Sequence, residues 1–182
     1  MGVASGKDTL VVNLFAGPST GKSSTMAGVF SEIKWRGIDA EMAPEYAKEK
    51  VWEESYKVLE NQIYIFGKQL HTIHRLIGKV DCVITDSPLL LSLIYGRHMT
   101  KAFHDLVLET FNSHRTLNIF LNRKKKYNPN GRMQTSEEAC LIDDEIKQML
   151  INNEIEFVEI DSEPKSTEII ANMIQLGIKG LR

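Results

Sequence analysis

Apolar residues are distributed along this chain in two different patterns. Five short runs are rich in β-branched and apolar residues, and longer stretches between them place apolar residues every three or four positions. The short runs are typical of buried strands, and the longer stretches are typical of amphipathic helices. The pattern predicts strands over residues 9–15, 39–42, 81–85, 117–121 and 155–160.

Helices are predicted between these strands and after the last one. Expected are a helix over 22–36, a long helical region over 48–77, a helix opened by Pro88, a helix over 137–150 and one from residue 165. Strands that alternate with helices indicate an α/β fold, in which a five-stranded parallel sheet carries helices on both faces. The chemistry of such a sheet is expected at the carboxyl ends of its strands.

The composition suits one globular domain over residues 1–182, with 42% hydrophobic and 25% charged residues. No apolar run approaches the ~20 residues of a membrane span, so no membrane partner is expected. The net charge of −2 gives no overall attraction to nucleic acid, which would have to bind at a local patch. Cys82 and Cys140 are expected to be buried thiols in a reducing compartment such as the cytoplasm.

The most informative segment follows the first predicted strand and reads AGPSTGKS over residues 16–23. A buried strand that ends in small residues, followed by a helix at Lys22, is the pattern of a phosphate-binding loop with alanine at its usual first glycine. The alternative is a small-residue turn that binds nothing, and the amphipathic helix after the segment argues against it. The residues expected to bind the nucleotide are Gly17, Pro18, Ser19, Thr20, Gly21, Lys22, Ser23 and Ser24.

Two of these side chains have expected roles of their own. Lys22 is predicted to reach the β- and γ-phosphates of a nucleoside triphosphate, and the Ser23 hydroxyl is predicted to bind Mg²⁺.

Asp86 ends an apolar strand, in the position of a carboxylate that binds the same Mg²⁺ or orients the attacking hydroxyl. The alternative is that Asp86 or Ser87 caps a helix that begins at Pro88.

A second carboxylate, Glu45, follows the second predicted strand directly after Pro44. From that strand end it is predicted to accept a proton from a substrate hydroxyl. The alternative is a solvated glutamate that begins a helix. Tyr46 beside it is expected either to line a ring-binding pocket or to join the core.

The segment 122–136 is strongly basic and contains a Pro-Asn-Gly turn, which predicts a lid over the phosphates. Arg123 and Arg132 are its candidates for neutralising charge during transfer, because a guanidinium matches phosphate oxygens. A solvated charge run is one alternative. Contact of Lys124, Lys125 and Lys126 with a nucleic-acid backbone is the other.

Polar residues of the long helical region give weaker signals. His71 and His74 lack a zinc-protease pattern and are expected on a helix surface or in the core. Gln62, Tyr64, Phe66 and Gln69 are expected to be packing residues, with Gln62 or Gln69 as the candidate that reads a substrate base.

Together these motifs resemble the P-loop kinases that act on nucleosides, nucleotides and related small molecules. The matching segments are AGPSTGKSS at 16–24, APEYAKE at 43–49, ITDSP at 84–88 and NRKKKYNPNGR at 122–132. The pattern is most similar to the group around nicotinamide riboside kinase and its phage relatives, which are often described as small AAA-type ATPases. The resemblance implies ATP with Mg²⁺, a basic lid, adenine beside residues 161–164, and, for a phage-encoded chain, the host cytoplasm.

The sequence therefore predicts a Mg²⁺–ATP-dependent kinase whose acceptor is a nucleoside or nucleotide. Some phage relatives phosphorylate 5-hydroxymethyluracil within DNA, and the basic lid keeps DNA open as an acceptor. A non-catalytic nucleotide-binding switch or ATPase is a further alternative. An oligomeric AAA motor is not favoured, because the chain lacks room for a separate helical domain. The sequence does not predict an oligomeric state.

Overall fold

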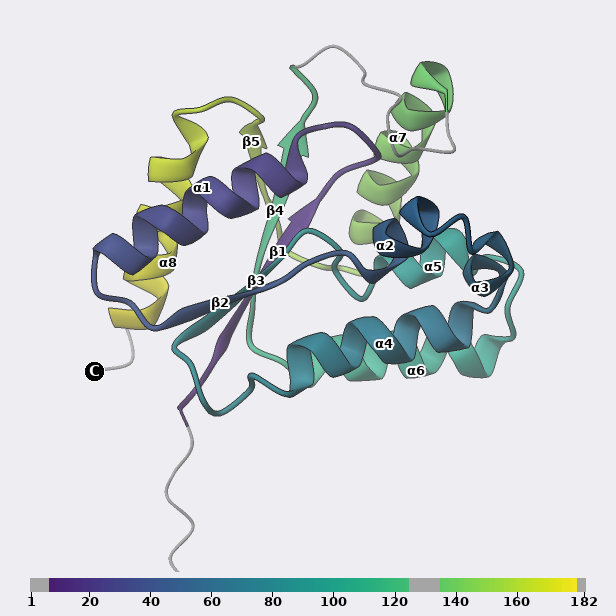
Figure 1. Cartoon of the computed structure of the whole chain (residues 1–182), viewed down its shortest axis with the longest axis horizontal. Helices are drawn as coiled ribbons and strands as arrows, with labels where there is room; N and C mark the ends of the chain where they lie inside the picture. The colour runs from purple at the N-terminus through teal and green to yellow at the C-terminus, as the bar shows by residue number, and fades with distance from the viewer. Residues whose placement is uncertain (1–6, 125–134, 180–182) are drawn as a thin grey trace, which may run out of the picture.

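Five parallel strands form one sheet at the centre of the computed structural model, which describes residues 7–124 and 135–179 (Figure 1). The strand order is β2-β3-β1-β4-β5, so the strand that precedes the phosphate loop is central. The strands are β1 (Leu10–Phe15), β2 (Ala40–Ala43), β3 (Cys82–Thr85), β4 (Thr116–Asn122) and β5 (Val158–Asp161). The predicted α/β fold with a five-stranded parallel sheet is confirmed, and each predicted strand overlaps an observed one.

Helices cover both faces of the sheet, with α1 and α8 together on one of them (Figure 1). The helices are α1 (Lys22–Trp35), α2 (Tyr46–Trp52), α3 (Tyr56–Glu60), α4 (Gln62–His74), α5 (Leu91–Tyr95), α6 (Lys101–Asn112), α7 (Ser136–Asn152) and α8 (Ser166–Lys179). None of the helices in the described part of the chain is long and apolar enough to cross a membrane.

The core has two halves, one on each face of the sheet, and β1 contributes to both. Val11 and Phe15 pack with residues of α4, α6 and α7. Leu10, Val12 and Leu14 pack on the other face with residues of α1 and α8. Because successive side chains of a strand point to opposite faces, a strand buried on both faces is apolar at nearly every position. Asn13 is the exception in β1, and its buried amide donates to Oδ1 of Asn118 on β4 at 2.9 Å.

The region 48–77, predicted as one long helical region, contains three helices. Glu54 adopts a left-handed conformation with φ of 54°, which ends the helical path after α2. Asn61 starts α4, because its side chain accepts a hydrogen bond from the backbone N–H of Tyr64 at 3.1 Å. The two breaks leave α2 as a short helix directly after β2.

The helix predicted to open at Pro88 is also different. Residues 88–91 form a turn in which the Leu91 N–H donates to the carbonyl of Pro88 at 3.0 Å, and α5 begins only at Leu91. It ends at Gly96, and a separate helix that was not predicted, α6, follows after its N-cap Thr100. Two helices, α5 and α6, therefore take the place of the single helix that the proline suggested.

The two cysteines have opposite environments. Cys82 is fully buried in β3, and burial raises the pKa of its thiol to about 12. Cys140 is exposed on α7, so the expectation that both thiols are buried is wrong for Cys140. It belongs to the outward surface of a helix whose inward face supplies the core.

Two helical glycines offer a matched test of the packing between α1 and α8. A Cβ added at Gly28 on α1 would lie 2.5 Å from Cγ2 of Thr167, whose hydroxyl donates to the Pro164 carbonyl. A Cβ at Gly67 on α4 would meet nothing within 4 Å. We expect Gly28→Ala to lower the free energy of unfolding by about 1 kcal/mol or more through overpacking. We expect Gly67→Ala to raise it by about 0.5–1 kcal/mol through helix propensity. Urea denaturation followed by circular dichroism measures both, and shifts of the same sign would contradict this account.

Candidate functional site

The loop between β1 and α1 has the backbone conformation of an anion-binding turn. Ser19 and Gly21 have positive φ values of 62° and 112°, with Thr20 between them. Such alternation of left-handed and ordinary residues turns successive N–H groups toward one side, where they bind anions. Gly21 is also the N-cap of α1, so the glycine is needed at the point where the loop becomes a helix.

Lys22, the first residue of α1, is folded back over this loop. Its Nζ donates to the carbonyl oxygens of Ala16 at 2.7 Å and Gly17 at 2.9 Å. The first turn of α1 contains no acidic side chain of its own. The ammonium group, the helix N-terminus and the loop therefore place several hydrogen-bond donors in one region, where they favour an anion.

Gly17 has a different role from Gly21, because its φ is not positive. A Cβ at this position would lie 2.6 Å from the carbonyl oxygen of Ala139 and 2.8 Å from Oδ1 of Asp143, both on α7. The glycine therefore allows α7 to approach the loop closely. The phosphate loop is supported from the side by a helix more than a hundred residues further along the chain.

Asp86 connects the end of β3 to the first turn of α1 and to the turn after β2. It follows β3, is 2% exposed, and accepts a hydrogen bond from the Ser23 hydroxyl at 2.5 Å. Its other carboxylate oxygen accepts the backbone N–H of Glu45, after β2, at 3.0 Å. A buried carboxylate is costly unless it is hydrogen-bonded, and these two donors satisfy it. The alternative role as a helix cap is not what the structure shows, since α5 begins at Leu91.

The oxygens of Ser23 and Asp86 are the kind of ligands that Mg²⁺ prefers in proteins, and Ser23 directly follows the anion-binding loop. The two side chains are hydrogen-bonded to each other, so a single ion could bind both of them. The residues present therefore fit Mg²⁺ with a triphosphate.

Glu45 lies at the N-terminus of α2, half-buried, beside Asp86. Pro44 precedes it and separates the end of β2 from the helix. The arrangement brings a second carboxylate to the same edge of the sheet as the phosphate loop and Asp86. The position of Glu45 before α2 also agrees with the alternative that this residue begins a helix. A residue that begins a helix can also accept a proton, so the two roles are compatible.

Arg123 follows β4 and lies against the phosphate loop rather than in solvent. Its Nε donates to Oδ2 of Asp143 at 2.9 Å, and its Nη2 lies 2.8 Å from the same oxygen. Oδ1 of Asp143 accepts the backbone N–H of Gly17 at 2.5 Å. One carboxylate on α7 therefore connects the arginine to the loop, and both side chains are about 15% exposed.

The structure describes only part of the rest of the predicted basic lid. Lys124 forms an ion pair with Asp161 at the end of β5, with 3.0 Å between Nζ and Oδ2, and this hydrogen bond lowers the pKa of Asp161. Arg132, Lys125 and Lys126 lie outside the described residues, so their roles stay predictions.

A family model described as an AAA domain matches residues 11–166, a range that contains every site residue named above. The chain belongs to the AAA domain family. P-loop domains of this kind generally bind a nucleoside triphosphate with Mg²⁺, in agreement with the loop geometry of this AAA domain.

The AAA domain is also similar to a solved structure described as "Crystal structure of NadR protein in complex with NR". The two share 18% sequence identity with a TM-score of 0.63, over 86% of this chain and 45% of the NadR chain. At this identity the similarity shows the fold alone, and the chain spans less than half the length of the NadR chain. No curated protein matches this sequence.

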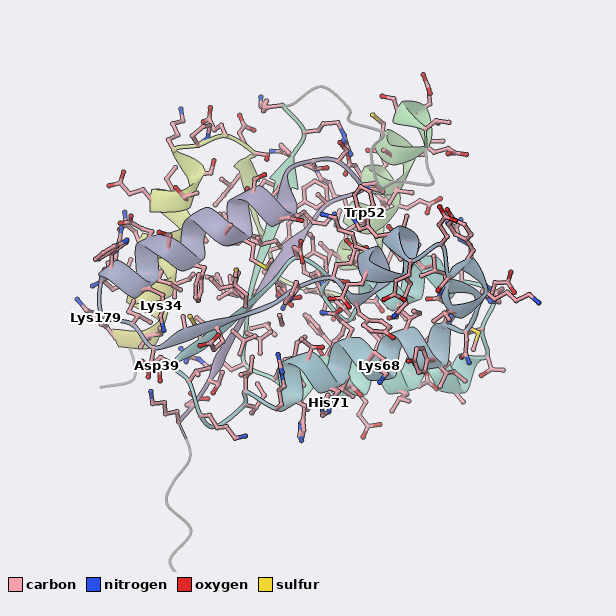
Figure 2. All side chains as sticks on the ribbon, viewed as in Figure 1. Lys34, Asp39, Trp52, Lys68, His71 and Lys179 are labelled. Carbon is pink, nitrogen blue, oxygen red and sulfur yellow. The ribbon has the colours of Figure 1, made fainter. Side chains whose placement is uncertain are left out.

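The polar residues of the region 48–77 have varied positions in the AAA domain. His71 and His74 are exposed on α4, and Figure 2 shows His71 on its outer surface beside Lys68. Gln62 is half-buried and donates to the carbonyl of Leu59 at 2.6 Å. The hydroxyls of Tyr46 and Tyr64 lie 3.0 Å apart, and this hydrogen bond raises the pKa of Tyr46.

Asp143 was not anticipated from the sequence, although a signal for it exists. The inward stripe of α7 runs through Ala139, Asp143, Ile146 and Leu150, at intervals of four, three and four residues. An acidic residue on such a stripe must be paired within the protein, because a charge is rarely buried alone. The sequence does not show that its partners are Arg123 and the Gly17 amide.

We expect Asp143→Ala to lower the free energy of unfolding by about 1–3 kcal/mol, because it leaves a largely buried amide and guanidinium without their acceptor. The exposed neighbour Asp144 supplies the matched control. Asp144→Ala should stay within about 0.5 kcal/mol of the parent. Urea denaturation compares the variants, and equal losses in both would show that the carboxylate of Asp143 does not support the loop.

Proposed function

We propose that this chain is a Mg²⁺–ATP-dependent kinase that transfers the γ-phosphoryl group to a hydroxyl or phosphate of a nucleoside- or nucleotide-type acceptor. It would act as one kinase domain over residues 1–182, with a lid over about 122–136. The observation that carries the proposal is the position of Asp86, whose two carboxylate oxygens contact Ser23 of the phosphate loop and the backbone of Glu45. A site that only bound nucleotide would not require the second carboxylate.

The nucleotide side is formed by β1, α1 and β3. The loop residues 17–24, with the backbone N–H groups that follow Pro18, and the Lys22 ammonium bind the triphosphate, and Ser23 and Asp86 hold Mg²⁺. When bound, the ion neutralises negative charge on the phosphates. The fixed loop and the helix N-terminus add favourable electrostatics without having to reorganise during the reaction.

The acceptor side is formed by the residues after β2. The Glu45 carboxylate takes the proton of the acceptor hydroxyl as the acceptor oxygen bonds to the γ-phosphorus. The bond from that phosphorus to the bridging oxygen breaks, and ADP leaves. Arg123, already beside the loop, and Arg132 neutralise the charge that develops on the transferring group.

A nucleoside-type acceptor is supported by the resemblance of the four sequence motifs to nucleoside kinases. The NadR structure of similar fold, which is in complex with NR, also agrees with a small acceptor. DNA that carries 5-hydroxymethyl pyrimidines remains the alternative acceptor. For that role the one described lysine of the basic run, Lys124, would have to exchange its partner Asp161 for a phosphate.

Transfer of label from γ-³²P-ATP with Mg²⁺ tests the proposal, first with free nucleosides and nucleotides and then with hydroxymethylated DNA. Lys22→Ala should reduce transfer by about 100-fold or more. Glu45→Gln should reduce kcat by about 100-fold or more while nucleotide affinity is kept. Glu49→Gln, an exposed carboxylate on the same helix, is the matched control and should change kcat by less than about twofold.

The distribution of label decides between the candidate functions. Label on a small molecule supports the nucleoside kinase, and label on the polymer replaces it with a DNA kinase. Bound ATP with no acceptor-dependent transfer in either set overturns the kinase in favour of a switch or ATPase. An equal effect of Glu45→Gln on nucleotide affinity and transfer would make that carboxylate structural.

A further inference from the structure

One polar side chain interrupts the inward face of α4. Phe66, Gln69 and Ile73 are the buried residues of this helix, and Gln69 is only 4% exposed. Lys68 and His71, one and two positions away, lie on the outer surface of the helix (Figure 2). A buried primary amide is unfavourable unless its hydrogen bonds are made, so its partners explain its presence there.

The partners of Gln69 are the ends of β2 and β3. Its Oε1 accepts the backbone N–H of Tyr46 at 3.1 Å. Its Nε2 donates to Oγ1 of Thr85 at 3.3 Å and to the Ala43 carbonyl at 3.5 Å. The Tyr46 N–H can only donate and the Ala43 carbonyl can only accept, so these two partners determine which way the amide is turned.

These contacts surround the two carboxylates of the site. Ala43 and Tyr46 are the residues on either side of the Pro44–Glu45 turn, and Thr85 directly precedes Asp86. The Thr85 hydroxyl also accepts the N–H of Ser87, on the other side of Asp86, at 3.1 Å. Gln69 therefore connects both sides of the turn that carries Glu45 to the strand end that carries Asp86.

The Tyr46 contact has a second effect, because Tyr46 is the first residue of α2. The first N–H groups of a helix have no partner within the helix. The side-chain oxygen of Gln69 supplies one, so it fixes where α2 begins and with it the orientation of Glu45. The hydrogen bond from Glu45 N–H to Asp86 connects the same turn to the end of β3, so Gln69 and Asp86 contact it from two directions.

We propose that Gln69 is a positioning residue of the transfer reaction, which holds the Glu45 turn in register with Asp86. The inference rests on the proposed kinase function and assigns no contact between Gln69 and either substrate. It differs from the expectation that Gln69 reads a base or packs, because the described amide contacts are with the protein backbone and a core threonine.

The test compares Gln69→Leu, which keeps the volume and removes both hydrogen-bonding groups, with Gln69→Glu, which keeps the acceptor for Tyr46. Gln148→Leu, at an exposed position of α7, is the matched control. We expect Gln69→Leu to lower kcat by about 10- to 100-fold with nucleotide Kd within about twofold, because misplaced groups cost rate rather than ATP binding. Gln69→Glu should restore part of kcat, and Gln148→Leu should leave kcat within about twofold.

A second measurement needs no turnover. Amide hydrogen exchange of the nucleotide-free protein should be about tenfold faster or more at Glu45 and Tyr46 in Gln69→Leu than in the parent, with the Gln62 region unchanged. If the parent transfers phosphate to no acceptor, the kinase proposal fails and the exchange rates still decide whether Gln69 holds the turn. Should Gln69→Leu not fold, Gln69→Glu is compared with the parent in the same two measurements. Parent-like kcat and exchange, or an equal loss of kcat and nucleotide affinity, would overturn the positioning role.

Discussion

The carboxylate of Asp86 is almost completely removed from water and receives its hydrogen bonds from the first turn of α1 and from the turn after β2. A charge in that position is tolerated only while both donors are in place, so the start of α1 and the ends of β2 and β3 are held in one arrangement. The interaction with Ser23 places the carboxylate beside the phosphate loop, and the interaction with the Glu45 backbone places the start of α2 beside the carboxylate. The geometry of the candidate site depends on this one buried group.

Polar residues on the inward faces of two helices support the loops of the candidate site. Gln69 on α4 contacts the backbone around Glu45, and Asp143 on α7 contacts the backbone of Gly17. Each of these side chains occupies a position that a purely apolar stripe would fill with a core residue. Strand-end loops have unsatisfied backbone N–H groups, and a helix that packs beneath them can provide the missing acceptors. The two helices thus orient the loops that carry the candidate site residues.

Much of this arrangement could be predicted because its signals are local. The apolar runs predict the strands, and AGPSTGKS with its following helix predicts the anion-binding loop. Asp86 could be placed because it ends an apolar strand. The breaks at Glu54 and Asn61 were missed because nothing in a glutamate predicts a positive φ. The partners of Gln69 and Asp143 could not be predicted, since they depend on which helix packs beneath which strand end. Arg132 stays a prediction, outside the described residues.

Because of the strand order, the two sides of the candidate site differ in how readily their strands open. β1 is hydrogen-bonded on both sides, to β3 and β4, whereas β2 is the four-residue outer strand of the described sheet and pairs with β3. Central strands open only in large unfolding events, and short outer strands open in small local ones. The phosphate loop is therefore attached to the most persistent part of the sheet, and Glu45 is attached to a strand that can open locally while the loop keeps its shape. If the chain is the kinase we propose, acceptors of different size can be admitted on the β2 side while the contacts to the phosphates are kept.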